Sequence, residues 1–402
     1  MTASHAFPTE SAGSSCPFMP VFGPPQVMFV RGHGTELFDA EGRRYLDFLC
    51  GIAVTSLGHA HPAIAEAMCE QSKRLLHVSN FFTNDAATSA AIELRQLLVE
   101  ATGHEGQVFF CNSGAEANEA ALKLARKFGG RGRHVVISAY GSFHGRTLAA
   151  LAATGQPAKH EPFFPMPDGF RHVAFGDLAE FERAIDPTVS AVLIETLQGE
   201  GGVVPADPEY LRGLRRVCDE RGLLLMVDEV QTGFARTGRW FGFEHAGIVP
   251  DVVTMAKAMG NGFPVGAVWA RTDVAAAFRP GDHGSTYSGT AIATAVVSAV
   301  IAEMRRIDAP ARAAAQGEAL RKKLAAVPGV VSVRGQGLLL GVELGDGVDA
   351  RAVSAELLTR GLVTNAVTAT ALRLAPPITV TDDEIDEAVA LVAAVLSEGT
   401  AS

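Results

Sequence analysis

The chain has 402 residues, with 34 lysines and arginines against 44 aspartates and glutamates. This length exceeds what one compact core usually supports, so we expect a large domain with a smaller companion. Hydrophobic residues make up 48% and charged residues 19%, which is ordinary globular usage and excludes disorder for most of the chain. Neither sign of charge forms a long run, so we expect no nucleic-acid partner and no membrane-surface partner.

The cysteines and the apolar stretches indicate the compartment. Five scattered cysteines without C-x-x-C spacing fit a reducing cytoplasm and predict no metal site. Residues 1–20 lack the basic region and apolar stretch of an export signal, and we expect them to form a flexible tail. Residues 291–302 are apolar but too short to span a bilayer, so they predict a buried helix in a cytoplasmic protein.

The first half of the chain predicts an α/β domain. Residues 34–49 alternate apolar and polar side chains around a turn, as a half-solvated hairpin does. Short apolar runs then alternate with amphipathic segments of helix length, which favours a mostly parallel sheet flanked by helices. The expected strands are residues 107–111, 134–138, 191–195, 223–227, 252–255 and 265–270, and the expected helices include residues 115–128 and 208–220.

The C-terminal part predicts strands again, followed by a helix. Strand-bearing segments are expected at residues 330–344 and 362–374, and an amphipathic helix at residues 382–397. We assign the two chain ends to one smaller α+β domain. The predicted division is a tail at 1–20, the N-terminal part of the small domain at 21–70, the large domain at 71–290 and the C-terminal part of the small domain at 291–402.

Three features that carry chemistry follow predicted strands of the large domain. Asp228 ends one apolar run, Lys257 follows another, and Ser113 and Gly114 open a helix after a third. The carboxyl ends of such strands form the ligand site of open α/β sheets, and a helix start with free N–H groups favours a phosphate. Singly, Asp228 could cap a helix or bind a metal, and Lys257 could be a solvated loop residue. Together they are the set expected for pyridoxal 5′-phosphate (PLP), in which the lysine forms a Schiff base and the aspartate pairs with the ring nitrogen.

Longer motifs support a family resemblance. They are YLDFLCGIAVTSLGHAHP, CNSGAEANEAALKLAR, GSFHGRTLAALAATGQP, QGEGGVVPADPEYL, DEVQTGFARTGRWF, HGSTYSG, RGQGLLLGVEL and LRLAPP. From about residue 20 to residue 397, the chain resembles the class III aminotransferases, which are PLP-dependent enzymes of fold type I.

The resemblance implies a set of cofactor contacts. Lys257 would carry PLP and Asp228 would hold its ring nitrogen protonated. The remaining contacts would be Ser113, Gly114 and Ala115 at the phosphate, Phe143 stacked on the ring, and Val230 and Gln231 beside it. Thr286 would reach the phosphate of the neighbouring subunit's cofactor, which implies a homodimer with shared active sites.

The resemblance also implies a reaction of arginine biosynthesis. The distal amino group of N2-acetyl-L-ornithine would pass to 2-oxoglutarate, giving N-acetylglutamate 5-semialdehyde and L-glutamate. Arg146 would bind the donor's α-carboxylate, with help from Ser285 of the partner subunit, and later the distal carboxylate of 2-oxoglutarate. Arg373 would bind the α-carboxylate of 2-oxoglutarate, and Glu200 would cover Arg373 when the donor is bound. Arg373 and Glu200 could also be structural, and we expect His144 to be a packed ring.

Some positions depart from the family pattern and leave the donor open. Thr196, Asn261 and residues 288–290 differ from the usual residues near the cofactor rim and the subunit boundary. One competing candidate is another ω-aminotransferase, which acts on ornithine, succinylornithine or 4-aminobutyrate. Two more candidates are a PLP enzyme that shifts an amino group within one molecule and a PLP-binding dimer without turnover.

Overall fold

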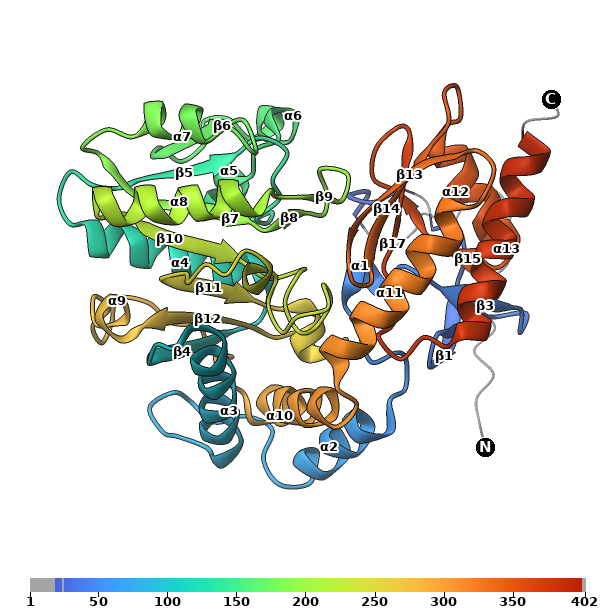
Figure 1. The fold of residues 1–402 in the computed structure, drawn as a ribbon. Coiled ribbons are helices and arrows are strands. Elements are labelled where there is room, and N and C mark those ends of the chain that lie inside the picture. The colour runs from blue at the N-terminus through green and yellow to red at the C-terminus, as the bar shows by residue number, and fades with distance from the viewer. Residues whose placement is uncertain (1–18, 24, 400–402) are drawn as a thin grey trace.

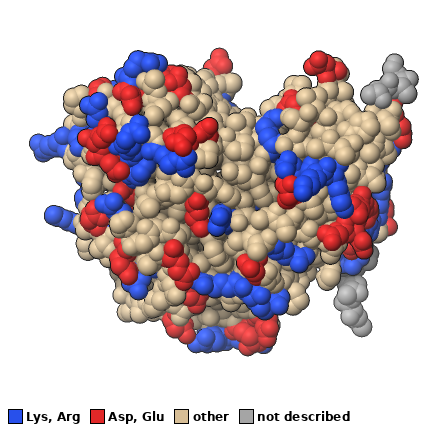
Figure 2. Space-filling view, viewed as in Figure 1, with Lys and Arg blue, Asp and Glu red and all other residues tan. Residues whose placement is uncertain are grey.

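The computed structural model describes residues 19–23 and 25–399 of the chain (Figure 1). Residues 1–18 of the predicted tail lie outside the described residues. Within the described part, no helix is both long and apolar enough to cross a bilayer. Basic and acidic side chains are interspersed over the face shown in Figure 2.

A seven-stranded sheet forms the centre of the larger part of the molecule. Its strands lie in the order β4 (Gly106–Cys111), β12 (Gly266–Arg271), β11 (Val252–Met255), β10 (Leu224–Asp228), β7 (Val189–Glu195), β5 (Val135–Ala139) and β6 (Phe170–Val173). The predicted strands and the mixed α/β architecture are confirmed, with shifts of one or two residues at strand ends. The edge strand β6 was not expected, because its four residues, FRHV, give no apolar run.

One strand runs against the others. β12 pairs antiparallel with both β11 and β4, whereas the pairs from β11 through β6 are parallel. The connection between β11 and β12 contains only a short 3-10 helix, Lys257–Gly260, and a turn. A parallel neighbour would need a crossover of a dozen or more residues, so the chain returns antiparallel.

Helices cover both faces of this sheet. Alternate residues of β7 point to opposite faces, so Leu193 packs in the cluster that contains α4 (Gly114–Gly129) and Ile194 in the cluster that contains α8 (Pro208–Arg221). Each fully buried Leu or Ile contributes roughly 1.5–3 kcal/mol. Further helices of this part are α5 (Leu148–Ala153), α6 (Pro157–His160), α7 (Leu178–Ala184) and α9 (Thr272–Ala275).

The two ends of the chain meet in the smaller part. The predicted hairpin is present as β2 (Glu36–Asp39) and β3 (Arg44–Asp47), extended by β1 (Phe29–His33), and β15 (Leu362–Val363) pairs with β3 from the other end of the chain. A second sheet contains β13 (Val330–Gln336), β14 (Leu339–Leu344), β17 (Ala371–Leu374) and β16 (Asn365–Ala366). A two-stranded sheet, β8 (Leu197–Gln198) with β9 (Val204–Pro205), lies between the two parts in Figure 1.

Helices complete this arrangement. The helices of the C-terminal part are α11 (Ala309–Ala325), α12 (Ala350–Thr359) and α13 (Asp382–Gly399), and α13 extends slightly beyond its predicted end. The predicted buried helix is α10 (Ala291–Arg306), which packs against α2 (Pro62–Ser72) and α3 (Asp85–Thr102) beneath the large sheet in Figure 1. The exact domain boundaries at residues 70 and 290 stay a prediction.

Candidate active site

The strands bring their last residues to one edge of the large sheet. Asp228 at the end of β10 is paired in register with Glu195 of β7 on one side and Thr254 of β11 on the other. A cavity of about 400 Å³ opens at this edge. Its lining includes most of the predicted site residues: Ser113, Gly114, Ala115, Phe143, Arg146, Glu200, Asp228, Val230, Gln231 and Lys257.

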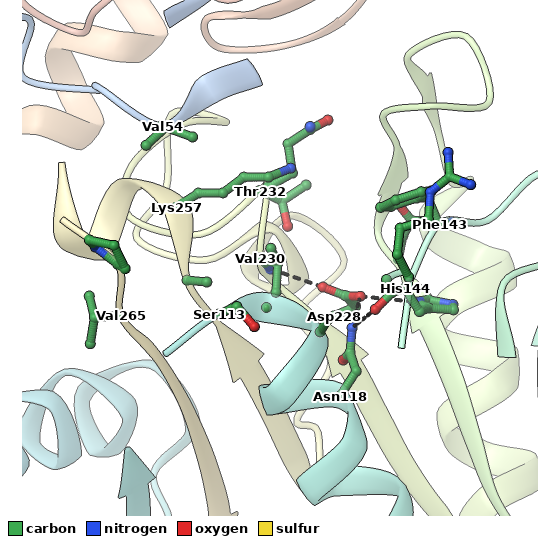
Figure 3. Close-up of a pocket in the computed structure, with 18 of the residues that line it drawn as sticks. Val54, Ser113, Asn118, Phe143, His144, Asp228, Val230, Thr232, Lys257 and Val265 are labelled. Atoms are coloured by element: carbon green, nitrogen blue, oxygen red, sulfur yellow. Dashed lines mark hydrogen bonds and ion pairs between the residues drawn. The ribbon is translucent and has the colours of Figure 1, made fainter. Parts of the chain in front are cut away.

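Asp228 is the centre of a buried hydrogen-bond network (Figure 3). It is 4% exposed, and its Oδ2 accepts from Asn118 Nδ2 at 2.8 Å and from His144 Nδ1 at 2.8 Å. Its Oδ1 accepts from the Val230 N–H at 3.0 Å. Asn118 is itself oriented by the Thr254 hydroxyl, which donates to Asn118 Oδ1 at 2.8 Å. These partners hold the carboxylate at the base of the cavity.

Lys257 lines the same cavity from the turn after β11. Figure 3 shows its side chain extended on one side of the cavity, with Phe143 on the other side and Asp228 between them in this view. Burial, with the nearby positive charge of Arg373, lowers the pKa of the Lys257 amine to about 8, although Glu200, Asp228 and Glu195 oppose the shift. An amine with this pKa is neutral for part of the time near neutral pH and can act as a nucleophile or a base.

The start of α4 faces the cavity. Ser113 is the N-cap of the helix, and its hydroxyl accepts from the Glu116 N–H at 3.2 Å. Gly114 and Ala115 line the cavity, and their N–H groups are among those that have no partner within the helix. A Cβ on Gly114 would lie 2.7 Å from Val230 Cγ1, so only glycine leaves the helix start this close to the β10 loop.

An aromatic side chain and a carboxamide side chain also line the cavity. Phe143 lines the cavity, and its backbone N–H donates to Glu195 Oε2 at 3.1 Å. Burial and the charge of Asp228 raise the pKa of Glu195 well above its usual range. Gln231 is 8% exposed, and its Oε1 is buried without a hydrogen-bond partner among the described residues. A buried acceptor of this kind is available to a ligand.

Two arginines lie at or beside the cavity. Arg146 lines it, with the guanidinium carbon 5.6 Å from the centroid of the Phe143 ring. Arg373 in β17 is 1% exposed, and its Nη1 donates to Glu200 Oε1 at 2.6 Å and its Nε to Asn365 Oδ1 at 3.2 Å. Burial raises the pKa of Glu200, but the charge and hydrogen bond of Arg373 outweigh this effect and lower that pKa below its usual value. The Nη2 of Arg373 is buried and has no partner among the described residues, so this cation keeps a free donor.

Besides Arg373, two predicted site residues lie outside the cavity of their own chain. The Ser285 hydroxyl accepts from Asn112 Nδ2 at 3.1 Å, and Thr286 is exposed. Neither residue contributes to the cavity lining.

Sequence reasoning missed Asn118, Glu195 and Thr254, and it treated His144 only as a packed ring. His144 is buried as expected, but it also binds Asp228, and its Nε2 has no partner among the described residues. The available signal was Asn118, a polar residue between Ala117 and Ala121 on the buried side of α4. A buried amide requires a polar partner, which predicts an acid or carbonyl facing that helix.

Comparisons with known proteins agree with this geometry. The family model described as "Aminotransferase class-III" matches residues 20–396. Acetylornithine aminotransferase of Corynebacterium efficiens is 48% identical, with 94% of each chain covered. Acetylornithine aminotransferase of Caldanaerobacter subterraneus is 46% identical, with 92% of this chain and 95% of the relative covered.

Solved structures share the fold. The ornithine aminotransferase of Toxoplasma gondii superposes with a TM-score of 0.89 at 32% identity, with 95% of this chain and 93% of that chain covered. The N-acetylornithine aminotransferase of Stenotrophomonas maltophilia superposes with a TM-score of 0.82 at 34% identity, with 94% and 98% covered.

Proposed function

Because the chain belongs to the class III aminotransferases, which are PLP-dependent transaminases, we propose that it transfers the distal amino group of N2-acetyl-L-ornithine to 2-oxoglutarate. The products are N-acetylglutamate 5-semialdehyde and L-glutamate. The observation that carries the choice of donor is the similarity to acetylornithine aminotransferases over nearly the whole chain.

The residues that line the cavity fit PLP. They provide an amine at Lys257, a buried carboxylate at Asp228, a helix start at Gly114 and an unpaired acceptor at Gln231. When bound, PLP draws electrons from the substrate carbon that carries the amino group, which makes the proton on that carbon easier to remove.

Each of these residues has a proposed role. Lys257 would hold the cofactor through its amine. After the donor's amine has displaced it, the freed Lys257 amine would move the proton of the substrate carbon, a role for which a pKa of about 8 is suited. Asp228 keeps a proton on the ring nitrogen by its negative charge, and Asn118 and His144 keep that carboxylate oriented. The helix start at Ser113, Gly114 and Ala115 binds the phosphate, while Phe143, Val230 and Gln231 contact the ring.

The two arginines divide the substrate carboxylates between them. The donor presents one α-carboxylate, which we assign to Arg146, whereas 2-oxoglutarate presents two and requires a second cation. Arg373 supplies that cation when Glu200 moves away from it. Two observations support this role. Glu200 accepts from Arg373 Nη1 at 2.6 Å and so neutralises the guanidinium, and Arg373 Nη2 has no partner among the described residues and can still donate to a substrate carboxylate.

We propose a homodimer in which Ser285 and Thr286 complete the partner's site. Thr286 is exposed on its own chain, and the same loop carries Tyr287, which is 60% exposed and lies 5.5 Å from His77 between ring centroids. The segment after His77 exposes Phe81 and Phe82 at 93% and 71%. Exposed apolar side chains gathered in this way are typical of protein interfaces.

We also propose that the enzyme works in the cytoplasm. The described cysteines, Cys50, Cys69, Cys111 and Cys218, are all free. Free thiols are typical of proteins in a reducing compartment.

A donor screen tests the proposal. Purified protein with PLP receives acetylornithine, succinylornithine, ornithine or 4-aminobutyrate, each with and without 2-oxoglutarate. L-glutamate is measured, and any isomer of the amine is detected by chromatography. The highest kcat/KM should be with acetylornithine, and turnover should require 2-oxoglutarate. A preference for another amine would identify that amine as the donor, and an isomer formed without 2-oxoglutarate would indicate an aminomutase. PLP binding without turnover would indicate a non-catalytic protein.

A further inference from the structure

The turn that carries Lys257 ends at Asn261, and the backbone conformation there does not by itself require an asparagine. Asn261 follows the 3-10 helix Lys257–Gly260 and has left-handed torsion angles, φ 43° and ψ 41°. Glycine adopts these angles without steric cost, and asparagine is among the few other residues that adopt them. If the turn were the only requirement, glycine would serve equally well.

The Asn261 side chain bridges to a distant segment. Its Oδ1 accepts from the Leu57 N–H at 2.7 Å, and its Nδ2 donates to the Gly58 carbonyl at 3.2 Å. Asn261 is 9% exposed, so both contacts are largely shielded from water. One carboxamide therefore satisfies two backbone groups that lie 204 and 203 residues away in the chain.

The segment that Asn261 holds forms a wall of the active-site cavity. Val54 lines that cavity, and Figure 3 shows it above Lys257, on the side away from Asp228. The four preceding residues, Cys50–Ala53, have positive φ of 53°, 61°, 70° and 60°. A left-handed turn of this length is rare for L-residues and needs contacts from outside to persist.

These outside contacts come from both sides of the turn. Asp47 Oδ1 accepts from the Cys50 N–H at 2.7 Å before the turn. After it, the buried Arg236 Nη2 donates to Ser56 Oγ at 2.7 Å, and the Asn261 bridge follows at Leu57. Of these three anchors, only Asn261 belongs to the turn that carries Lys257.

We propose that Asn261 is a positioning residue that fixes the distance between the Val54 wall and the Lys257 amine, and so determines how tightly an ω-amine donor is held. The inference rests on the proposed function, since it assigns substrate to the space between these two walls. Asn261 acts through Val54 and does not itself line the cavity. The chain therefore sets donor affinity partly from outside the cavity.

The test compares Asn261→Gly with Asp308→Gly. Asn261→Gly keeps the left-handed backbone and removes only the carboxamide. Asp308 also has a positive φ, 48°, is exposed and makes no side-chain cap hydrogen bond. Asp308→Gly therefore gains the same backbone freedom as Asn261→Gly, but at a position that does not line the cavity. Asn261→Asp is a third variant, which keeps an acceptor for Leu57 but sets an oxygen against the Gly58 carbonyl.

Two readouts are used. In the cofactor-free protein, hydrogen exchange of the Leu57 amide should be faster by roughly three- to tenfold in Asn261→Gly, which corresponds to one lost hydrogen bond, and unchanged in Asp308→Gly. Asn261→Asp should retain most of this protection. In the holoenzyme, Asn261→Gly should raise KM for the donor by a similar factor and change kcat less, because glycine still supports the Lys257 backbone.

The outcomes separate this inference from the proposed function. Unchanged Leu57 exchange, or a KM equal to that of Asp308→Gly, overturns the positioning role. A wild-type protein that turns over no ω-amine refutes the proposed function, while the exchange measurement still decides whether Asn261 holds the 54–58 segment.

Discussion

Replacing Asp228 by asparagine tests the electrostatic centre of the site. The carboxylate accepts three hydrogen bonds, two on Oδ2 from Asn118 and His144 and one on Oδ1 from the Val230 N–H. An asparagine can accept on one atom only. Whichever way its amide is placed, an NH₂ group faces at least one of these donors, and the negative charge is lost.

The size of the effect follows from the burial of Asp228. Two opposite unit charges about 4 Å apart interact by roughly 4 kcal/mol at the effective dielectric constant of a partly buried site. Each ~1.4 kcal/mol corresponds to a factor of about ten in rate, so losing the charge that stabilises a protonated ring nitrogen should lower kcat by about three powers of ten. PLP binding should persist, because the α4 start and Lys257 are unchanged.

The assay measures single-turnover rates with acetylornithine and PLP affinity from the absorbance of the bound cofactor. Glu229→Gln is the matched control, since Glu229 is the next residue, is 1% exposed and is absent from the cavity lining. Its carboxylate accepts from the Gly242 and Phe243 N–H groups, so this control should lose stability while the folded fraction keeps its rate. A rate for Asp228→Asn within tenfold of wild type would refute the role of the Asp228 charge.

Five further predictions concern other residues or measurements. Folding lowers the pKa of Lys257 from 10.5 to about 8 in the cofactor-free protein. Between pH 8 and pH 10.5 the unfolded chain therefore binds more protons than the folded chain, so the free energy of unfolding rises with pH. Lys257→Met should remove this rise, measured by urea unfolding at several pH values. Borohydride reduction should attach the cofactor to wild-type Lys257, and label on another lysine would contradict this. Arg373→Ala should raise the activation free energy of the half-reaction with 2-oxoglutarate by roughly 2 kcal/mol or more, and that of the half-reaction with the donor far less. Arg146→Ala should slow both half-reactions. Equal losses in the two half-reactions of Arg373→Ala would show that Arg373 is structural. Glu200→Ala should raise the unwanted reaction with glutamate, measured as the ratio of its kcat/KM to that of acetylornithine. Arg236→Ala should lower the free energy of unfolding by roughly 1–3 kcal/mol for each buried acceptor left unpaired, and an unchanged urea midpoint would contradict the contacts to Leu338, Pro376 and Ser56.

Short segments of the sequence were enough to predict most helices and strands and the chemical type of the site. Apolar runs of strand length gave most strands of the large sheet, and Ser113 caps α4 because a hydroxyl beside a helix start acts within three residues. Asp228 and Lys257 could be predicted because each directly follows an apolar strand, and strand ends of an open sheet share one edge. The family resemblance added the roles of individual residues, which remain proposals.

Tertiary structure decided what depends on strand order and on partners distant in the chain. The Asn118–Asp228 contact spans 110 residues and the Arg373–Glu200 contact 173, and nothing within either local segment specifies the other. Asn261 could be recognised as a departure from the family pattern, but its bridge to Leu57 joins positions 204 residues apart that only the folded chain brings together. Periodicity and capping act over a few residues, whereas these contacts require the whole sheet to be assembled, so the sequence identified the reactive groups and the folded chain determined how they are held.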